Sequence, residues 1–135
     1  MNLESRDKRK KLGINRFINS FKYSFDGLAY AIKKEQSILV MAVFLLIVIA
    51  GGIFFNITFL EWFFVLIAIG LVLGTELLNT AIEATIDLTC PKLDPLAKIA
   101  KDTASASVFV YSVIAFIIGC LIFLPKVIKF IEGII

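Results

Sequence analysis

Three carboxylates and one amide share a face in the middle of the chain, at the end of a long apolar run. They are Glu76, Asn79, Glu83 and Asp87, hereafter the acidic stripe. With about 100° of rotation per residue, the last three lie roughly −60°, −20° and +20° from Glu76 around a helix. Acids within a membrane helix are costly and usually mark a functional site. The spacing therefore predicts a site on one narrow helical face.

The types of polar side chain limit the chemistry of this site. The 135 residues include no histidine, which excludes an imidazole base, a phosphohistidine or a His-ligated metal. Carboxylates with an amide suit a hard cation such as Mg²⁺, and lysines such as Lys98 and Lys101 suit phosphates. Together with a carboxylate that activates a hydroxyl, these are the components of phosphoryl transfer. The GxxxxGK[ST] and kinase glycine-loop motifs are absent.

The elements that must position these residues are predicted to be helices in a membrane. Hydrophobic residues make up 59% of the chain and the mean hydropathy is +0.93, which indicates a bilayer rather than a soluble core. Residues 14–35 show the pattern of an amphipathic helix that lies in the membrane interface. Three spanning helices are expected at about 37–55, 59–87 and 104–124. Residues 96–102 are expected to form a short helix, and Pro125 to close the last span.

We therefore predict an all-α membrane protein with a basic tail at residues 1–13 and a single membrane domain at 14–135. The first 34 residues carry nine Lys and Arg and the loop 88–102 carries three, whereas the turn 56–58 carries none. The positive-inside rule places the N-terminus and the loop in the cytoplasm. The tail is expected to contact anionic lipid rather than nucleic acid. The acidic stripe would then open to the cytoplasm, where nucleotides are.

Two other functions are compatible with parts of this pattern. The acids and lysines could pair across helices and fix the oligomer of a non-enzymatic membrane scaffold. A small proton-coupled transporter could also place a glutamate in a membrane helix, although it would not explain three further polar groups in the same stripe. The residues alone thus indicate a cytoplasm-facing site for a cation and phosphate.

Two motifs resemble the signature of the small bacterial integral-membrane diacylglycerol kinases. They are ELLNTAIEATID at residues 76–87 and LAKIAKD at residues 96–102. The order of elements also agrees, and the resemblance extends over nearly the whole chain from about Arg16. The segments LLNTAIE, DPLAK and GCLIFLPKV, at 77–83, 94–98 and 119–127, are most similar to the Gram-positive branch of undecaprenol kinases.

The resemblance implies a multi-pass enzyme of the cytoplasmic membrane that transfers the γ-phosphate of ATP, with Mg²⁺, to a lipid alcohol. Undecaprenol is the expected substrate, with diacylglycerol as the alternative. The family also implies a homotrimer whose active sites are shared between subunits.

The same motif match assigns roles to individual residues. Glu76 would be the catalytic base that activates the lipid hydroxyl, and Glu35 and Glu83 would hold the metal with ATP. The expected nucleotide-binding residues are Arg16, Tyr23, Glu35, Glu83, Asp87, Lys101 and Asp102. The expected supporting or substrate residues are Asn79, Lys98 and Ser105.

Overall fold

The computed structural model describes residues 14–90, 92 and 94–133, so the predicted basic tail at 1–13 lies outside the described residues. Four helices make up the described chain: α2 (Ile14–Lys34), α3 (Gln36–Phe54), α4 (Phe59–Thr89) and α5 (Pro95–Glu132). The helices α3, α4 and α5 are long and apolar enough to cross a membrane. The prediction of an all-α chain with three candidate spans after an N-terminal helix is confirmed. The chain divides into two units after Lys34.

The first unit contains α2, an amphipathic helix. Its apolar side chains are largely uncovered within the chain: Ile14 is 78% exposed, Phe17 67% and Phe25 68%. Phe17 and Phe21 pack edge to face one helical turn apart, with 4.9 Å between ring centroids. A charged helix with such an apolar face is suited to lying in the membrane interface.

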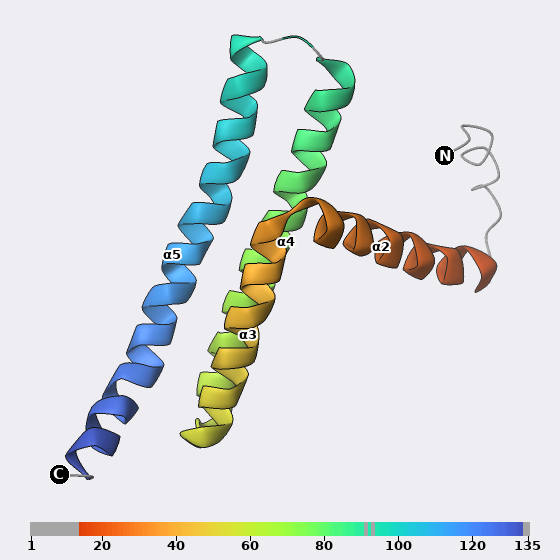
Figure 1. Ribbon diagram of the computed structural model, residues 1–135. Helices are drawn as coiled ribbons and strands as arrows, with labels where there is room; N and C mark the ends of the chain where they lie inside the picture. Colours follow the sequence, from red (N-terminus) through yellow and green to blue (C-terminus); the bar gives the residue numbers. More distant parts are fainter. Residues whose placement is uncertain (1–13, 91, 93, 134–135) are drawn as a thin grey trace. The chain divides into compact units, whose positions relative to one another are not determined.

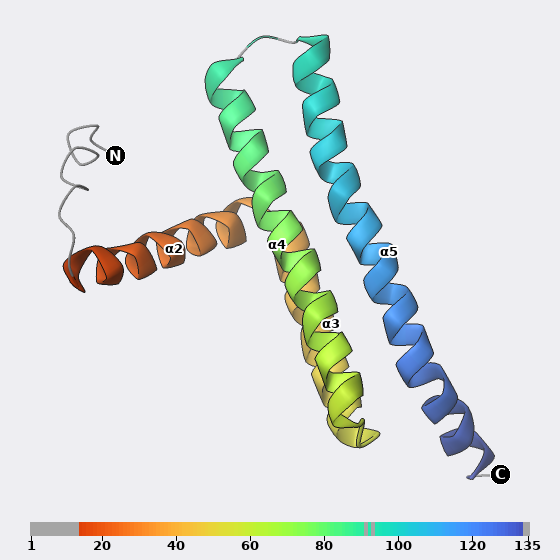
Figure 2. The ribbon, with the colours of Figure 1, turned by 180° about the vertical axis from the view of Figure 1, so that it is seen from behind.

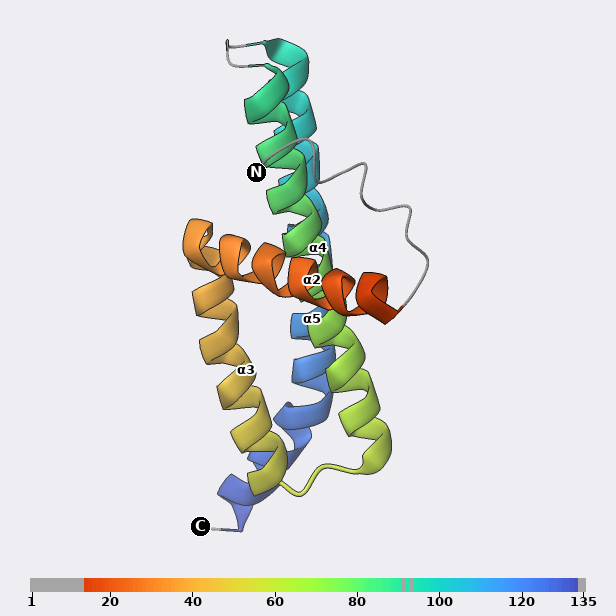
Figure 3. The same cartoon turned by 90° about the vertical axis from the view of Figure 1, so that its right-hand side faces the viewer.

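The second unit begins with α3, which ends in a tight turn. The N–H of Ile57 donates to the carbonyl of Gly52 over 3.0 Å, and the N–H of Asn56 donates to that of Ile53 over 3.2 Å. This pair of bonds is the Schellman motif, which satisfies carbonyls at a helix end. Asn56 has a φ of 53°, a left-handed conformation that Asn tolerates better than most residues. The turn sends α4 back alongside α3 (Figure 3).

A capping box starts α4 directly after this turn. The Thr58 hydroxyl accepts from the Glu61 N–H over 3.3 Å, and a Glu61 carboxylate oxygen accepts from the Thr58 N–H over 2.6 Å. The other Glu61 oxygen lies 3.0 Å from the Lys126 ammonium on α5. One glutamate therefore both caps α4 and joins it to α5.

Close packing at this turn depends on the absence of a side chain at Gly52. A Cβ built there would lie 2.7 and 2.8 Å from ring atoms of Trp62 and 3.1 Å from Cδ1 of Ile57. The buried cluster of the second unit lies at the same end and draws on all three helices and the turn. Its buried members are Ile57, Val65 and Ile122, with Val48, Phe55, Trp62, Ile69, Ile118 and Phe123 packed around them.

The helix α5 is longer than the sequence predicted. Asp94 caps its start by accepting from the N–H groups of Leu96 and Ala97 over 2.7 and 3.4 Å, and Pro95 occupies its first position. The expected short helix at 96–102 and the expected span at 104–124 are therefore parts of one helix.

Pro125, which was predicted to close the last span, lies within a helix that continues to Glu132. A proline within a helix removes one backbone hydrogen bond and crowds the preceding turn. Contacts beyond it hold the helix in place: Lys126 pairs with Glu61, and the Phe130 ring packs against Phe54 and Phe55 with centroids 5.4 and 6.1 Å apart. Tertiary contacts thus outweigh the local preference of the proline.

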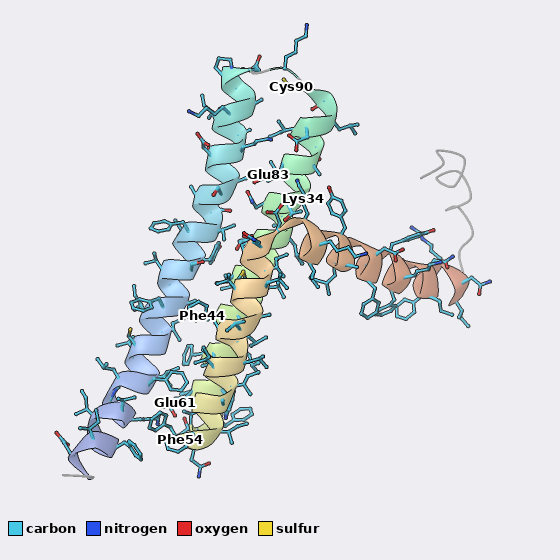
Figure 4. The ribbon with its side chains drawn as sticks, in the orientation of Figure 1. Lys34, Phe44, Phe54, Glu61, Glu83 and Cys90 are labelled. Carbon is cyan, nitrogen blue, oxygen red and sulfur yellow. The ribbon has the colours of Figure 1, made fainter. Side chains whose placement is uncertain are left out.

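The two longer helices extend past the start of α3. At roughly 1.5 Å per residue, α3 is about 28 Å long and α4 about 46 Å. The hairpin of α4 and α5 consequently continues beyond the first residue of α3 to the loop that joins them (Figures 1 and 2). Glu83 lies on this projecting part of α4 and Cys90 directly follows the helix, whereas Phe54 and Glu61 lie at the opposite, turn end (Figure 4).

The contact between Gly52 and Trp62 predicts the effect of one added methyl group. We expect Gly52→Ala to lower the free energy of unfolding by about 1–3 kcal/mol, because the ring must shift within a packed cluster. Denaturant titration of the detergent-solubilised protein measures this change. Gly70→Ala is the matched control, since a Cβ there meets nothing within 4 Å. Equal stability of the two variants would contradict the prediction.

Candidate active site

The centre of the site is a buried glutamate that joins two helices. Glu76 on α4 is only 4% exposed, and its carboxylate accepts a hydrogen bond from the hydroxyl of Ser37, the second residue of α3. The helix length from Ser37 to Gly52 is about 22 Å, and that from Trp62 to Glu76 about 21 Å, at roughly 1.5 Å per residue. The two antiparallel helices are therefore in register at both ends. Glu76 lies level with the first turn of α3.

Two more polar residues on the same stretch of α4 are buried. Asn79 is 7% exposed and Thr80 3% exposed, and with Glu76 they are the buried polar residues of the described chain. The Thr80 hydroxyl donates to the backbone carbonyl of Glu76 over 3.0 Å. The Asn79 side-chain amide donates to a carboxylate oxygen of Glu83 over 3.1 Å. Within the predicted stripe, Asn79 and Glu83 are thus joined side chain to side chain across one helical turn.

The amide oxygen of Asn79 is buried and accepts no hydrogen bond within the described residues. Leaving a buried acceptor unsatisfied costs roughly 1–3 kcal/mol, so such an atom calls for an explanation. It lies on the same side chain that holds the Glu83 carboxylate. One side chain thus carries an unsatisfied buried oxygen and orients the Glu83 carboxylate.

The outer end of the stripe is linked to α5 by an ion pair. The Lys101 ammonium lies 2.5 Å from a carboxylate oxygen of Asp87, and the two side chains are 37% and 55% exposed. Exposed pairs of this kind contribute about 0–1 kcal/mol to stability. The pair therefore places a cation beside the acidic stripe with little effect on the fold.

The remaining predicted residues lie directly before α3, on α5 and on α2. Glu35 is half-buried and precedes α3, where its side chain makes no capping hydrogen bond. Lys98, Asp102 and Ser105 are exposed on α5. Arg16 and Tyr23 are exposed on α2, in the first unit. The contacts of the second unit thus join the acidic stripe to Ser37 and Lys101.

Two residues of the site were not predicted from the sequence. Thr80 could have been found, since the fourth residue after Glu76 falls on the same helical face. Ser37 carries a weak signal only, as a hydroxyl at the start of an apolar run. Its partner lies 39 positions away on another helix, and periodicity within one helix does not reveal such a pairing.

The donor atoms present fit Mg²⁺ bound together with a nucleotide. Within residues 14–90, 92 and 94–133, no three His, Cys, Asp or Glu side chains gather to hold a metal ion by themselves. Mg²⁺ usually takes one or two carboxylates and completes its shell with water and substrate phosphates. Glu83, the Asn79 oxygen beside it and Glu35 are donors of this kind.

Comparisons with known proteins agree with this chemistry. The sequence model of the prokaryotic diacylglycerol kinase family matches residues 22–123. The chain is 41% identical over 124 residues to the undecaprenol kinase of Bacillus subtilis, covering 92% of this chain and 99% of the relative. It is 36% identical over 101 residues to the diacylglycerol kinase of Haemophilus influenzae, covering 75% and 86%. The diacylglycerol kinase of Escherichia coli K12 is 28% identical over 110 residues, covering 82% and 90%.

The resemblance inferred from the two sequence motifs is therefore confirmed over most of the chain. With its three apolar helices and this match, the chain is a multi-pass membrane protein and belongs to the prokaryotic diacylglycerol kinase family of lipid kinases.

Proposed function

We propose that this protein phosphorylates undecaprenol, with ATP as the phosphoryl donor. The observation that carries the proposal is Glu76, a buried carboxylate held by Ser37 at the level of the first turn of α3. A lipid alcohol can bring its hydroxyl to that level while its tail stays in the hydrocarbon. The identity of 41% to the undecaprenol kinase of Bacillus subtilis supports the choice of lipid. Diacylglycerol is the second candidate, since other relatives are named diacylglycerol kinases.

Glu76 acts as the general base. It accepts the proton of the lipid hydroxyl as the hydroxyl oxygen forms a bond to the γ-phosphorus of ATP. The bond between that phosphorus and the β–γ bridging oxygen breaks, and ADP leaves with the bridging oxygen. A positioned base contributes about 10²–10⁴-fold to such a step. The products are the lipid monophosphate and ADP.

Glu35 and Glu83 would hold Mg²⁺ with the nucleotide, and the buried Asn79 oxygen lies beside Glu83 as a further candidate donor. Mg²⁺ bound there would neutralise charge on the phosphates. Lys101 binds phosphate oxygens, and its exposed ammonium beside Asp87 supports that role. The other residues of the proposed nucleotide site are Arg16, Tyr23, Asp87 and Asp102, with Lys98 and Ser105 in support.

The enzyme is proposed to be one membrane kinase domain over residues 14–135 that assembles as a homotrimer with shared active sites. Apolar side chains in the middle of the spanning helices remain uncovered within one chain, with Phe44 62% exposed and Phe116 72% exposed. Lipid and neighbouring subunits would cover these surfaces. The excess of basic residues in the first 34 positions and in loop 88–102 supports a cytoplasmic N-terminus and active site.

The choice of lipid is tested with radiolabelled ATP and the purified protein in mixed micelles. We expect phosphate transfer to undecaprenol at a higher kcat/KM than to diacylglycerol. A preference for diacylglycerol would reverse the assignment of the substrate, and no transfer to either lipid would contradict the kinase function.

Glu76→Gln tests the base. The variant keeps the size of the side chain and an oxygen that accepts from Ser37, but it has no carboxylate to take the proton. We expect kcat to fall by about 10²–10⁴-fold with ATP binding and the folded fraction retained. Glu132→Gln, at an exposed position near the end of α5, is the control and should remain active. Turnover of Glu76→Gln at the unchanged rate would remove Glu76 from this role.

Glu83→Ala tests the proposed metal ligand. The variant loses a carboxylate that Asn79 orients, so we expect the Mg²⁺ concentration for half-maximal rate to rise by about tenfold or more. Rates measured over a Mg²⁺ titration give this value, with Glu132→Ala as the control. A variant that unfolds, while its folded fraction keeps the original Mg²⁺ dependence, would show that Glu83 is structural.

A further inference from the structure

We propose that Ser37 is a positioning residue for the reaction: its hydroxyl holds one carboxylate oxygen of Glu76 and leaves the other for the lipid hydroxyl. The inference rests on the proposed function of Glu76 as the base and adds a residue on a different helix to the site. It follows from the hydrogen bond that the Ser37 hydroxyl donates across from α3 to α4.

A glutamate side chain has freely rotating methylene groups, so a base of this kind needs a partner to fix its direction. Glu76 is 4% exposed, and a carboxylate removed from water is costly unless it accepts hydrogen bonds. Ser37 supplies such a bond from outside α4. Because the hydroxyl is uncharged, this contact is a hydrogen bond and not an ion pair.

The place of Ser37 in α3 adds to this effect. As the second residue of the helix, it lies in the first turn, where backbone N–H groups have no partner within the helix and the helix dipole is positive. An anion at this end is stabilised by both features. The hydrogen bond from Ser37 therefore brings the Glu76 carboxylate to the first turn of α3.

The start of α3 also links the proposed base with the proposed metal site. Glu35 is the residue immediately before α3, has an extended backbone with φ of −106° and ψ of 114°, and does not cap the helix with its side chain. Ser37 follows two residues later and contacts Glu76. A single short segment thus fixes the spacing between the proposed base and one proposed metal ligand.

The kinetic test replaces the hydroxyl and measures kcat and KM separately. For Ser37→Ala we expect kcat to fall by about 10- to 100-fold, the value for one hydrogen bond to a charged group. The KM for ATP should stay within about twofold, because the hydroxyl contacts the base and not the nucleotide. Ser37→Thr, which keeps a hydroxyl, should recover most of the rate.

Ser107→Ala is the matched control. Its hydroxyl donates to the backbone carbonyl of Ala104 within α5, so the variant loses a hydroxyl of the same type that does not contact Glu76 and should keep the original rate. Size-exclusion chromatography reports the folded fraction of each variant. Should Ser37→Ala not fold, Ser37→Cys replaces it, with a weaker donor and an intermediate rate expected.

Several results would overturn the positioning role. These are an unchanged kcat in Ser37→Ala, an equal loss in Ser37→Thr, a change in the KM for ATP alone, or failure of both the Ala and Cys variants to fold. The proposed function fails separately, when the unchanged protein phosphorylates neither undecaprenol nor diacylglycerol. The variants are assayed with whichever lipid the unchanged protein prefers, so the two failures are distinguishable.

Discussion

The antiparallel register of α3 and α4 is the constraint on which the rest of the second unit depends. At the turn end the register is set by close steric fit, because Trp62 lies where a side chain on Gly52 would be. At the other end it brings Ser37 to Glu76. A shift of one residue at the turn would carry Ser37 about 1.5 Å along the axis and about 100° around it. The position of the glutamate thus depends on a glycine and a tryptophan at the far end of the helix pair.

The polar groups of α4 share one face of the helix and differ in how deeply they are buried. Glu76 and Asn79 are buried, Glu83 is half-buried, and Asp87 is exposed beside Lys101. Each position lies about one turn further from the first turn of α3, so water becomes more accessible along the series. An apolar lipid and a highly charged nucleotide need opposite surroundings, and a helix longer than its neighbour α3 offers both within a few turns.

Much of this arrangement could be predicted from the sequence. Uninterrupted apolar runs indicated the spanning helices, and the spacing of Glu76, Asn79, Glu83 and Asp87 predicted that they share one face. Both results depend on residues close together in the chain, for which helical geometry alone is sufficient. The hydrogen bond from Asn79 to Glu83, four residues apart, is of this local kind.

Features that depend on contacts between helices could not be predicted in the same way. Pro125 is a helix breaker by local preference, but Lys126 and Phe130 make contacts with the turn end that keep α5 helical. The pairing of Ser37 with Glu76 requires the register of two helices, which a steric fit at the opposite end determines. The roles of Glu35, Lys101 and Asp102 came from family motifs and remain proposals.

The uneven distribution of packing along the second unit affects how it can move. The buried cluster of Ile57, Val65 and Ile122 lies at the turn end, where a capping box and an ion pair add further restraints. Segments with fewer buried contacts open at lower free energy than the packed core. The turn end, which holds the cluster, the capping box and the ion pair, is therefore expected to be the last part of the second unit to open.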